Sequence, residues 1–114
     1  MKRRFRLTSS TDFERVRRLG KSYAHPFIVL IALPNEMDNS RFAIAAGRSI
    51  GKAVQRNRAK RIIRETLRPL ISSIASGWDI VLLARKPITT AAYPEIEAAI
   101  KTLLSRANLL ENTP

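Results

Sequence analysis

The stretch from residue 51 to residue 64 constrains the fold most, because it combines the densest charge of the chain with a strong helical pattern. Its sequence, GKAVQRNRAKRIIR, is rich in good helix formers, and Gly51 suits the start of a helix. At 3.6 residues per turn, the apolar side chains fall largely on one side, where they face a core. These side chains are Val54, Ala59, Ile62, Ile63 and the following Leu67.

The cations of this helix form stripes that work against its own stability. Arg56, Lys60 and Arg64 follow one another at intervals of four residues, and like charges at that spacing cost about 0.2–0.5 kcal/mol per pair. The cations also begin in the amino-terminal half, where the helix dipole favours anions. A polyanion laid along the stripe would reverse both effects, so the pattern favours a nucleic-acid-binding helix over an ordinary solvated one.

The charge of the whole chain supports the same interpretation. Lys and Arg together number 21 against 9 acids, which gives a formal net charge of +12. Such an excess is typical of nucleic-acid binders, whereas the basic helix lacks the Trp- and Leu-rich face of a membrane anchor. Without cysteine or a long apolar run, the sequence leads us to expect a cytoplasmic protein with no membrane partner.

The rest of the chain predicts an α+β domain with the element order α-β-β-β-α-β-α. A basic arm (1–7), expected to be extended, precedes a helix that begins at the capping-box pattern of residues 11–14 and ends at Gly20. An amphipathic pattern predicts a last helix over 90–107, and 108–114 is expected to be a flexible tail. Apolar runs predict four strands, at residues 21–25, 27–33, 41–46 and 78–84.

These elements predict a two-layer sandwich of helices on a small mixed four-stranded sheet, in a single domain over residues 1–114. The polar turn at 34–40 should return the chain antiparallel. The strands on either side of the basic helix are expected to be parallel neighbours, since a helix connects them. Pro69 is expected to end or kink the basic helix near Arg68.

The side chains offer little for catalysis by the protein itself. The one histidine, His25, lies beside Pro26, and the nine acids are scattered without the converging carboxylates of a two-metal nuclease. We therefore expect a binding surface, with no catalytic residue and no metal ligand in the protein. Phe13 and Phe27 offer stacking faces for unpaired bases, although core packing is the simpler interpretation of each alone. Cations at predicted strand ends, which suit a phosphate backbone, are Arg48, Arg85 and Lys86.

With these residues identified, the chain resembles the protein subunit of bacterial ribonuclease P over residues 3–107. The most specific match is the string Ala-Val-x-Arg-Asn-Arg-x-Lys-Arg-x-x-Arg at 53–64, which carries the Arg-Asn-Arg signature of that family. Supporting matches are Asp12-Phe13, Gly20 and residues 79–86. The resemblance implies a fold similar to the second domain of ribosomal protein S5, with a left-handed crossover through the basic helix. Physics alone would favour a right-handed one.

The resemblance also implies a function. In this family the RNA subunit is the catalyst, which uses Mg²⁺ to remove the 5′ leader of precursor tRNA, and the protein binds both that RNA and the leader. The metal is expected to be held mainly by the RNA subunit and the substrate, and no obligate protein partner is implied. By position, the contacts with the RNA subunit fall to Arg56, Asn57, Arg58, Lys60, Arg61 and Arg64. The leader cleft would be lined by Phe13, Arg17, Phe27, Arg48, Ser49, Arg85 and Lys86.

Arg17 and Ser49 depart from the family pattern, in which an aromatic residue and a lysine are common at these positions. The detail of the leader contacts is therefore open, and so are three other functions. A structural RNA-binding protein of the ribosomal kind shares the charge and the basic helix, but it would confer no cleavage. A stand-alone metal nuclease would cut without an RNA subunit, and a small DNA-binding regulator would bind duplex DNA as tightly as precursor tRNA.

Overall fold

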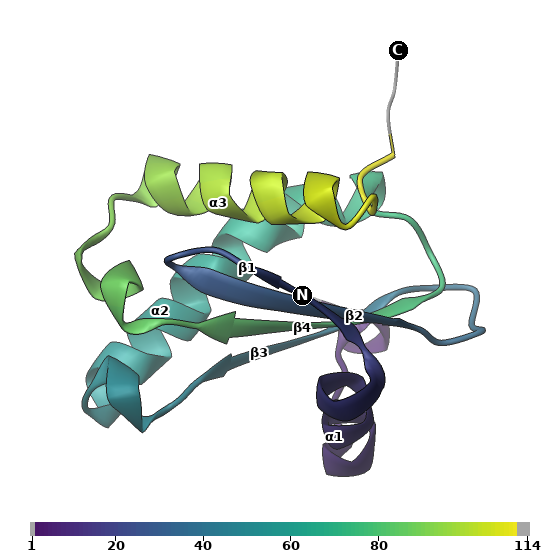
Figure 1. Ribbon diagram of the computed structural model, residues 1–114, viewed down its shortest axis with the longest axis horizontal. Coiled ribbons are helices and arrows are strands. Elements are labelled where there is room, and N and C mark those ends of the chain that lie inside the picture. Colours follow the sequence, from purple (N-terminus) through teal and green to yellow (C-terminus); the bar gives the residue numbers. More distant parts are fainter. Residues whose placement is uncertain (1, 112–114) are drawn as a thin grey trace.

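A four-stranded mixed sheet forms the middle of the structure, a computed structural model that describes residues 2–111 (Figure 1). The strands are β1 (Lys21–Ala24), β2 (Ile28–Pro34), β3 (Arg41–Ala46) and β4 (Trp78–Ala84), in the spatial order β1-β2-β4-β3. β2 is antiparallel to β1 and to β4, whereas β3 and β4 are parallel, as expected. β3 does run antiparallel to β2, but β4 lies between them, because β4 is apolar on both faces and takes the central position.

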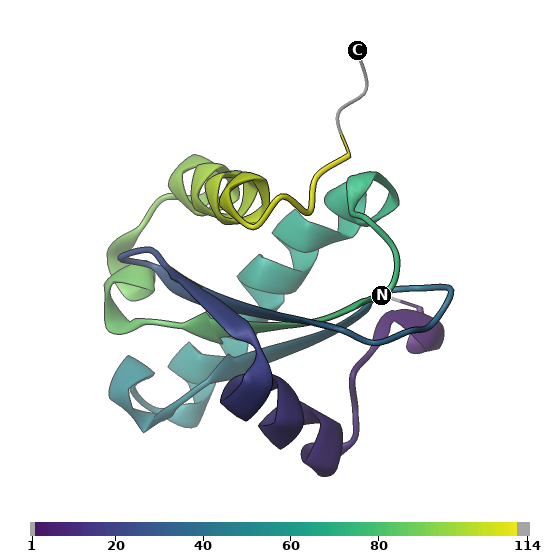
Figure 2. The ribbon, with the colours of Figure 1, turned by 45° about the vertical axis from the view of Figure 1, so that its right-hand side comes forward.

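Helices cover both faces of the sheet (Figure 2). α2 (Ala53–Leu67) and α3 (Tyr93–Arg106) pack on one face and enclose the larger core, and with the sheet they form the two layers expected from the sequence. The two-layer prediction did not include a helix on the other face. α1 (Ser10–Leu19) packs on the opposite face over a smaller apolar cluster. Side chains alternate along β4 accordingly, with Ile80 and Leu82 facing the larger core and Val81 facing α1.

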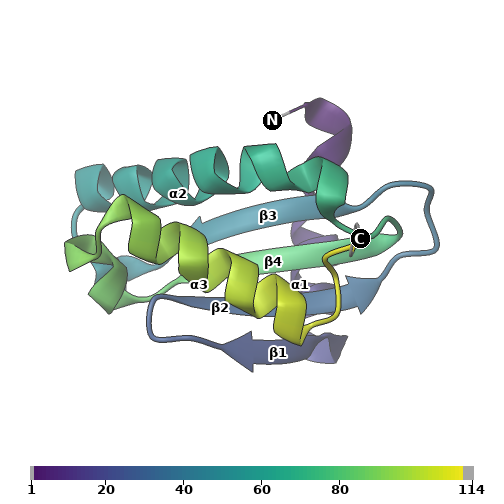
Figure 3. The same cartoon turned by 90° about the horizontal axis from the view of Figure 1, so that it is seen from above.

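The connection from β3 through α2 to β4 is left-handed. When α2 and α3 are turned towards the reader, β3 and β4 both run to the left and β4 lies below β3 (Figure 3). Strand twist alone disfavours this hand, and the family resemblance implied it.

The amino-terminal arm is not an extended segment. Residues Arg3–Phe5 form a short 3₁₀ turn, η1, and Arg6 then pairs with Phe42 on the outer edge of β3. The amide of Leu7 donates to the carbonyl of Phe42 at 2.8 Å, and the Leu7 side chain is buried in the smaller cluster. Leu7 and Phe5 supply the apolar contacts that fasten the arm, so its basic residues are presented from a fixed position.

The other end of the chain is also fastened as far as Glu111. Leu109 is fully buried, and Leu110 pairs with Ile74 at the end of η3 (Arg68–Ser73). The expectation of a flexible tail from residue 108 is therefore wrong for 108–111, because two leucines there complete the core. Residues 112–114 lie outside the described residues.

α1 begins earlier than the capping-box pattern at residues 11–14 predicted. Ser9 is the N-cap, and its hydroxyl accepts a hydrogen bond from the amide of Asp12 at 3.3 Å. Ser9 and Asp12 are themselves a Ser-x-x-Asp pair, so the sequence offered two overlapping starts and the first one is used. The helix ends at Gly20, as expected.

Gly20 lies where α1 passes directly into β1, and a side chain does not fit there. A Cβ atom on Gly20 would lie 2.5 Å from the carbonyl oxygen of Val16 and 2.7 Å from Cγ2 of Ile31. We expect Gly20→Ala to lower the free energy of unfolding by about 1–3 kcal/mol, measured by urea denaturation. Gly47→Ala is the matched control, since a Cβ there meets nothing within 4 Å. Equal midpoints for the two variants would contradict the close approach.

Candidate nucleic-acid interface

The basic helix α2 begins at a backbone conformation that requires glycine. Gly51 has φ 138°, and a Cβ atom there would collide with the side chain of Gln55. That glutamine instead accepts a hydrogen bond from the amide of Lys52 at 2.7 Å, which satisfies one donor at the helix start. At the other end, α2 stops at Leu67, and Pro69 is the second residue of the η3 turn (Arg68–Ser73) that follows, as expected. The start and the end of α2 are therefore both set by local sequence.

The buried side of α2 is formed by Ala59, Ile63 and Leu67, with Ile62 partly buried beside them. Val54 was predicted to share this side, and that prediction is wrong, because its side chain is 78% exposed. Val54 precedes Ile63 by nine residues, about two and a half turns, so it points in the opposite direction. An apolar side chain therefore lies in the open among the cations at the start of the helix.

Every cation of the predicted RNA-subunit set reaches the surface. Arg56, Lys60 and Arg64 are half-buried along one flank of α2, next to the core. The remaining members of the set, Asn57, Arg58 and Arg61, are exposed on the outer side, and so is Arg68 just after the helix. The cations thus cover the outer surface of α2 and one of its flanks.

The positive charge of α2 is not compensated by acids. Within residues 2–111, every ion pair is formed by cations that lie outside α2, and none involves a cation of α2. The acid on α2 itself, Glu65, makes none either. The pairs are Asp12 and Asp79 with Arg15 and Arg41, Glu14 with Arg17, and Glu97 with Lys101. α2 therefore presents a row of free cations, as a polyanion-binding surface requires.

One groove joins α2 to the face of the sheet that carries α1. It has a volume of about 400 Å³ and brings Arg64 of α2 together with Phe13 of α1 and Arg6 of the arm. The sequence assigned Arg64 to one candidate contact and Phe13 to another, and the structure places both in the same groove. Arg6 belongs to the basic arm, and its pairing with β3 is what brings it here.

Most of the other predicted leader residues gather at one end of the sheet. Arg48 and Ser49 are exposed in η2 (Arg48–Ile50), which contacts η4 (Lys86–Thr90). Lys86 begins η4, and Arg85 precedes it and donates its amide to the carbonyl of Phe27 at 2.9 Å. The parallel pairing of β3 and β4 explains this gathering, because both strands end at the same edge.

Phe13 and Phe27 pack against different clusters. Phe13 borders the smaller cluster under α1, whereas Phe27 borders the larger core and lies 5.1 Å from the ring of His25. Arg17, one turn after Phe13, is exposed and pairs with Glu14 at 3.6 Å. Each ring is partly buried, so both belong to the edge of a core and still retain an accessible part.

The comparisons with known proteins identify the family of this chain. The family model Ribonuclease P matches residues 1–108. The chain belongs to the ribonuclease P protein family. It is 40% identical over 109 residues to the ribonuclease P protein component of Herpetosiphon aurantiacus, covering 96% of this chain and 89% of the relative. It is 39% identical over 113 residues to the ribonuclease P protein component of Dehalococcoides mccartyi, covering 99% of this chain and 92% of the relative.

Solved structures of this family show the same fold. The RNase P protein of Staphylococcus aureus matches with a TM-score of 0.85 and 30% identity, over 94% of this chain and 98% of that one. The RNase P protein of Thermotoga maritima matches with a TM-score of 0.81 and 33% identity, over 89% of this chain and 96% of that one. The expected α+β fold with helices on a mixed four-stranded sheet is therefore confirmed.

This family member also holds a cluster of charges that sequence reasoning missed. Asp79 of β4 is fully buried and accepts hydrogen bonds from Arg41 Nε at 2.9 Å and Nη2 at 2.8 Å. It also accepts from Arg15 of α1 and from Asn35. The hydrogen bond to Asp79 raises the pKa of Arg41 above its usual value, so the guanidinium stays charged. The cluster connects α1 to the sheet and so positions Phe13.

The same cluster bears on metal binding. Asp12 and Asp79 do converge, contrary to the impression of scattered acids, but arginines occupy the space between them. Within residues 2–111, no three His, Cys, Asp or Glu side chains come together as a metal site would require. The same part of the chain contains no helix long and apolar enough to cross a membrane.

Proposed function

We propose that this chain is the protein component of a ribonuclease P and binds the RNA subunit of that enzyme along α2. The observation that carries the proposal is the row of unpaired cations on α2, in a chain whose relatives are named ribonuclease P protein components. An RNA laid along the row would remove the repulsion between Arg56, Lys60 and Arg64. Each phosphate that the row neutralises would release counterions and add to the affinity.

In this proposal the chemistry belongs to the RNA subunit, which cuts precursor tRNA with Mg²⁺ bound to RNA. In this proposal the protein supplies no general base. Its one histidine, His25, accepts a hydrogen bond from the amide of Phe27 at 3.1 Å, in the turn between β1 and β2. The acid pair Asp12 and Asp79 is held by arginines. The role of the chain is to reduce the repulsion between two polyanions as one docks on the other.

The 5′ leader of the precursor is proposed to contact the surface between α1 and the end of the sheet. The groove with Phe13 and Arg64 lies beside the RNA-binding row, so a leader there would run next to the RNA subunit. Cations at the sheet end, including Arg48 and Lys86, would follow its phosphates.

Cleavage of a 5′-extended precursor tRNA at low magnesium tests the proposal. We expect cutting at the mature 5′ end only when this protein and a bacterial ribonuclease P RNA are combined. Protein alone should be inactive, and cutting by protein alone would place a catalytic site among the acids. If the RNA is active at high magnesium and a matched RNA still gains nothing from the protein at low magnesium, a structural RNA-binding role replaces the proposal.

Phe13→Leu tests the leader contact, because leucine preserves the apolar packing and removes the aromatic face. We expect it to weaken binding of precursor tRNA to the assembled enzyme by about five- to tenfold, the loss of one stacked base. Binding of mature tRNA, which has no leader, should not change. Tyr93→Leu, an exposed aromatic residue at the start of α3, is the control. An equal loss for both tRNAs would contradict a leader contact.

A further inference from the structure

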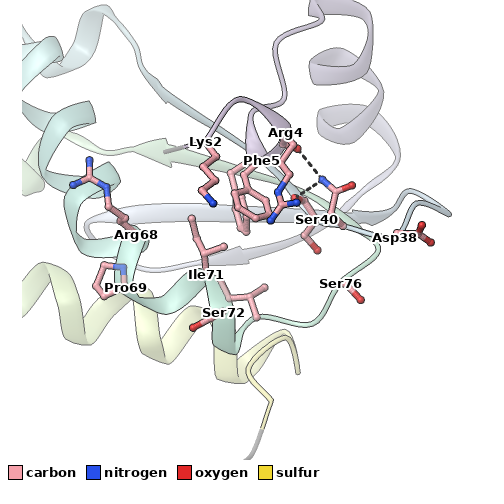
Figure 4. A pocket seen from close by; sticks show the side chains of 13 residues that line it. Lys2, Arg4, Phe5, Asp38, Ser40, Arg68, Pro69, Ile71, Ser72 and Ser76 are labelled. Atoms are coloured by element: carbon pink, nitrogen blue, oxygen red, sulfur yellow. Dashed lines mark hydrogen bonds between the residues drawn. The ribbon is translucent and has the colours of Figure 1, made fainter.

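A second and larger groove lies away from the Phe13 groove, at the carboxyl end of α2. It has a volume of about 790 Å³, in the range of ligand pockets, and is formed by the amino-terminal arm, η3 and the loops at the start of β3 and β4. Lys2 and Arg4 of the arm face Ile71 and Ser72 of η3 across the groove (Figure 4). Of the cations of the candidate interface described above, only Arg68, just after α2, lines this groove.

The chemistry of its walls is specific. The floor is apolar, and its members are Phe5, Phe42, Ile71 and Ile74. The rim carries three cations, Lys2, Arg4 and Arg68, against one acid, Asp38. No ion pair within residues 2–111 neutralises any of the three cations. A ligand that fits these walls is therefore apolar in one part and anionic in another.

The arm also provides a planar stacking surface. The guanidinium carbon of Arg4 lies 4.8 Å from the centroid of the Phe5 ring, so the cation covers one face of the aromatic side chain. Aromatic rings and guanidinium planes are the surfaces on which unpaired bases stack in RNA complexes. Because Arg4 lies against Phe5, an aromatic ring and a guanidinium group are available to a base at one position.

The groove is held in shape by hydrogen bonds from the protein itself. The side-chain amide of Asn39 donates to the carbonyl of Arg4 at 2.7 Å, which fixes the arm above the loop. The hydroxyl of Ser40 donates to the carbonyl of Ala75 at 2.6 Å and accepts from the amide of Trp78 at 3.0 Å. These bonds tie the two loops together, so a ligand would bind a preformed site and lose little affinity to ordering.

We propose that this groove receives one unpaired nucleotide of the RNA that binds α2. The base lies on the apolar floor against Phe5, and the flanking phosphates are held by Lys2, Arg4 and Arg68. Arg68 follows Arg61 by seven residues, about 10 Å along the helix, so a strand that follows the cations of α2 reaches the groove directly. The inference rests on the proposed function, because it takes the RNA on α2 as its ligand.

The first test compares the affinity of variants for a ribonuclease P RNA over a range of salt concentrations. Phe5→Leu is expected to weaken binding about tenfold with an unchanged log–log salt slope, because it removes stacking and no charge. Arg68→Gln is expected to reduce the slope by about 0.7–0.9, one phosphate contact. Tyr93→Leu and Lys101→Gln likewise remove one aromatic ring and one positive charge, but on α3, and they should leave affinity and slope unchanged.

The second test locates the nucleotide directly. A photoreactive benzophenone side chain at position 71, on the floor of the groove, should cross-link to a single unpaired nucleotide of the RNA in the assembled complex. Cross-links to paired nucleotides, or to a second copy of the protein, would overturn the inference and indicate a different occupant. Unchanged urea midpoints for Phe5→Leu and Arg68→Gln would show that any loss of binding is local.

The outcomes separate this inference from the proposed function. If the unmodified protein neither binds the RNA nor supports cleavage, the proposed function fails. If the unmodified protein does both, and the two groove variants match their controls, only the inference about the groove fails.

Discussion

Replacing Arg56, Arg58 and Arg61 together by glutamine is expected to weaken binding of a ribonuclease P RNA by about a hundred- to a thousandfold at 0.1 M salt. Each phosphate contact contributes about 0.7–0.9 to the slope of log affinity against log salt concentration. Between 1 M and 0.1 M salt, three such contacts therefore raise the affinity of the unmodified protein by about two or three powers of ten, and the triple variant loses this gain. The side chains carry no structural ion pair within residues 2–111, so the fold should be unaffected. Filter binding across a salt series measures both the affinity and the slope.

The matched control replaces three exposed cations elsewhere, Arg18, Lys21 and Lys101, and lowers the net charge by the same amount. A general attraction between a basic protein and RNA would weaken equally in both triple variants. Contacts made by α2 itself would weaken only in the first. Equal slopes for the two variants would therefore remove α2 from its proposed role, even if overall binding fell.

α2 was predictable because its signals are local. Helix formers, the start at Gly51 and the end at Pro69 act within a few residues, and the cations lie on the surface whatever the rest of the chain does. Val54 was misplaced because its direction depends on the exact phase of the helix, and it lies about two and a half turns from the centre of the buried side. Apolar character alone did not reveal that phase.

Features that depend on distant parts of the chain were not predictable in the same way. Asp79 stands in an apolar strand, and only the sheet register places it opposite Arg41 and beneath Arg15. The ends of the chain were judged by composition, which is polar, although Leu7 and Leu109 complete two separate clusters of the core. The groove shared by Phe13 and Arg64 also required the packing of α1 and α2 around the edge of the sheet.

The buried carboxylate gives the largest expected effect on stability. Asp79→Ala should lower the free energy of unfolding by about 3 kcal/mol, because removal of one partner leaves buried donors unpaired. This value is at the lower end of the range of about 3–5 kcal/mol that is usual for breaking a buried ion pair. The reason is that the Arg41 side chain is 21% exposed and keeps a second partner in Asp12 at 3.5 Å. For a chain of this size the melting temperature should fall by about 10 °C, measured by calorimetry. Asp38→Ala, an exposed acid without an ion pair within residues 2–111, should change stability by less than about 0.5 kcal/mol.

The same substitution should separate the two RNA contacts. Asp79 holds α1 through Arg15, and α1 carries Phe13, whereas α2 packs on the opposite face of the sheet. At a temperature where Asp79→Ala is folded, binding of the RNA subunit should be close to normal, but preference for precursor over mature tRNA should fall. Amide hydrogen exchange should be faster in α1 and unchanged in α2. If α1 and α2 both lost protection from hydrogen exchange, the Asp79 cluster would stabilise the whole fold. It would then have no separate role in positioning Phe13.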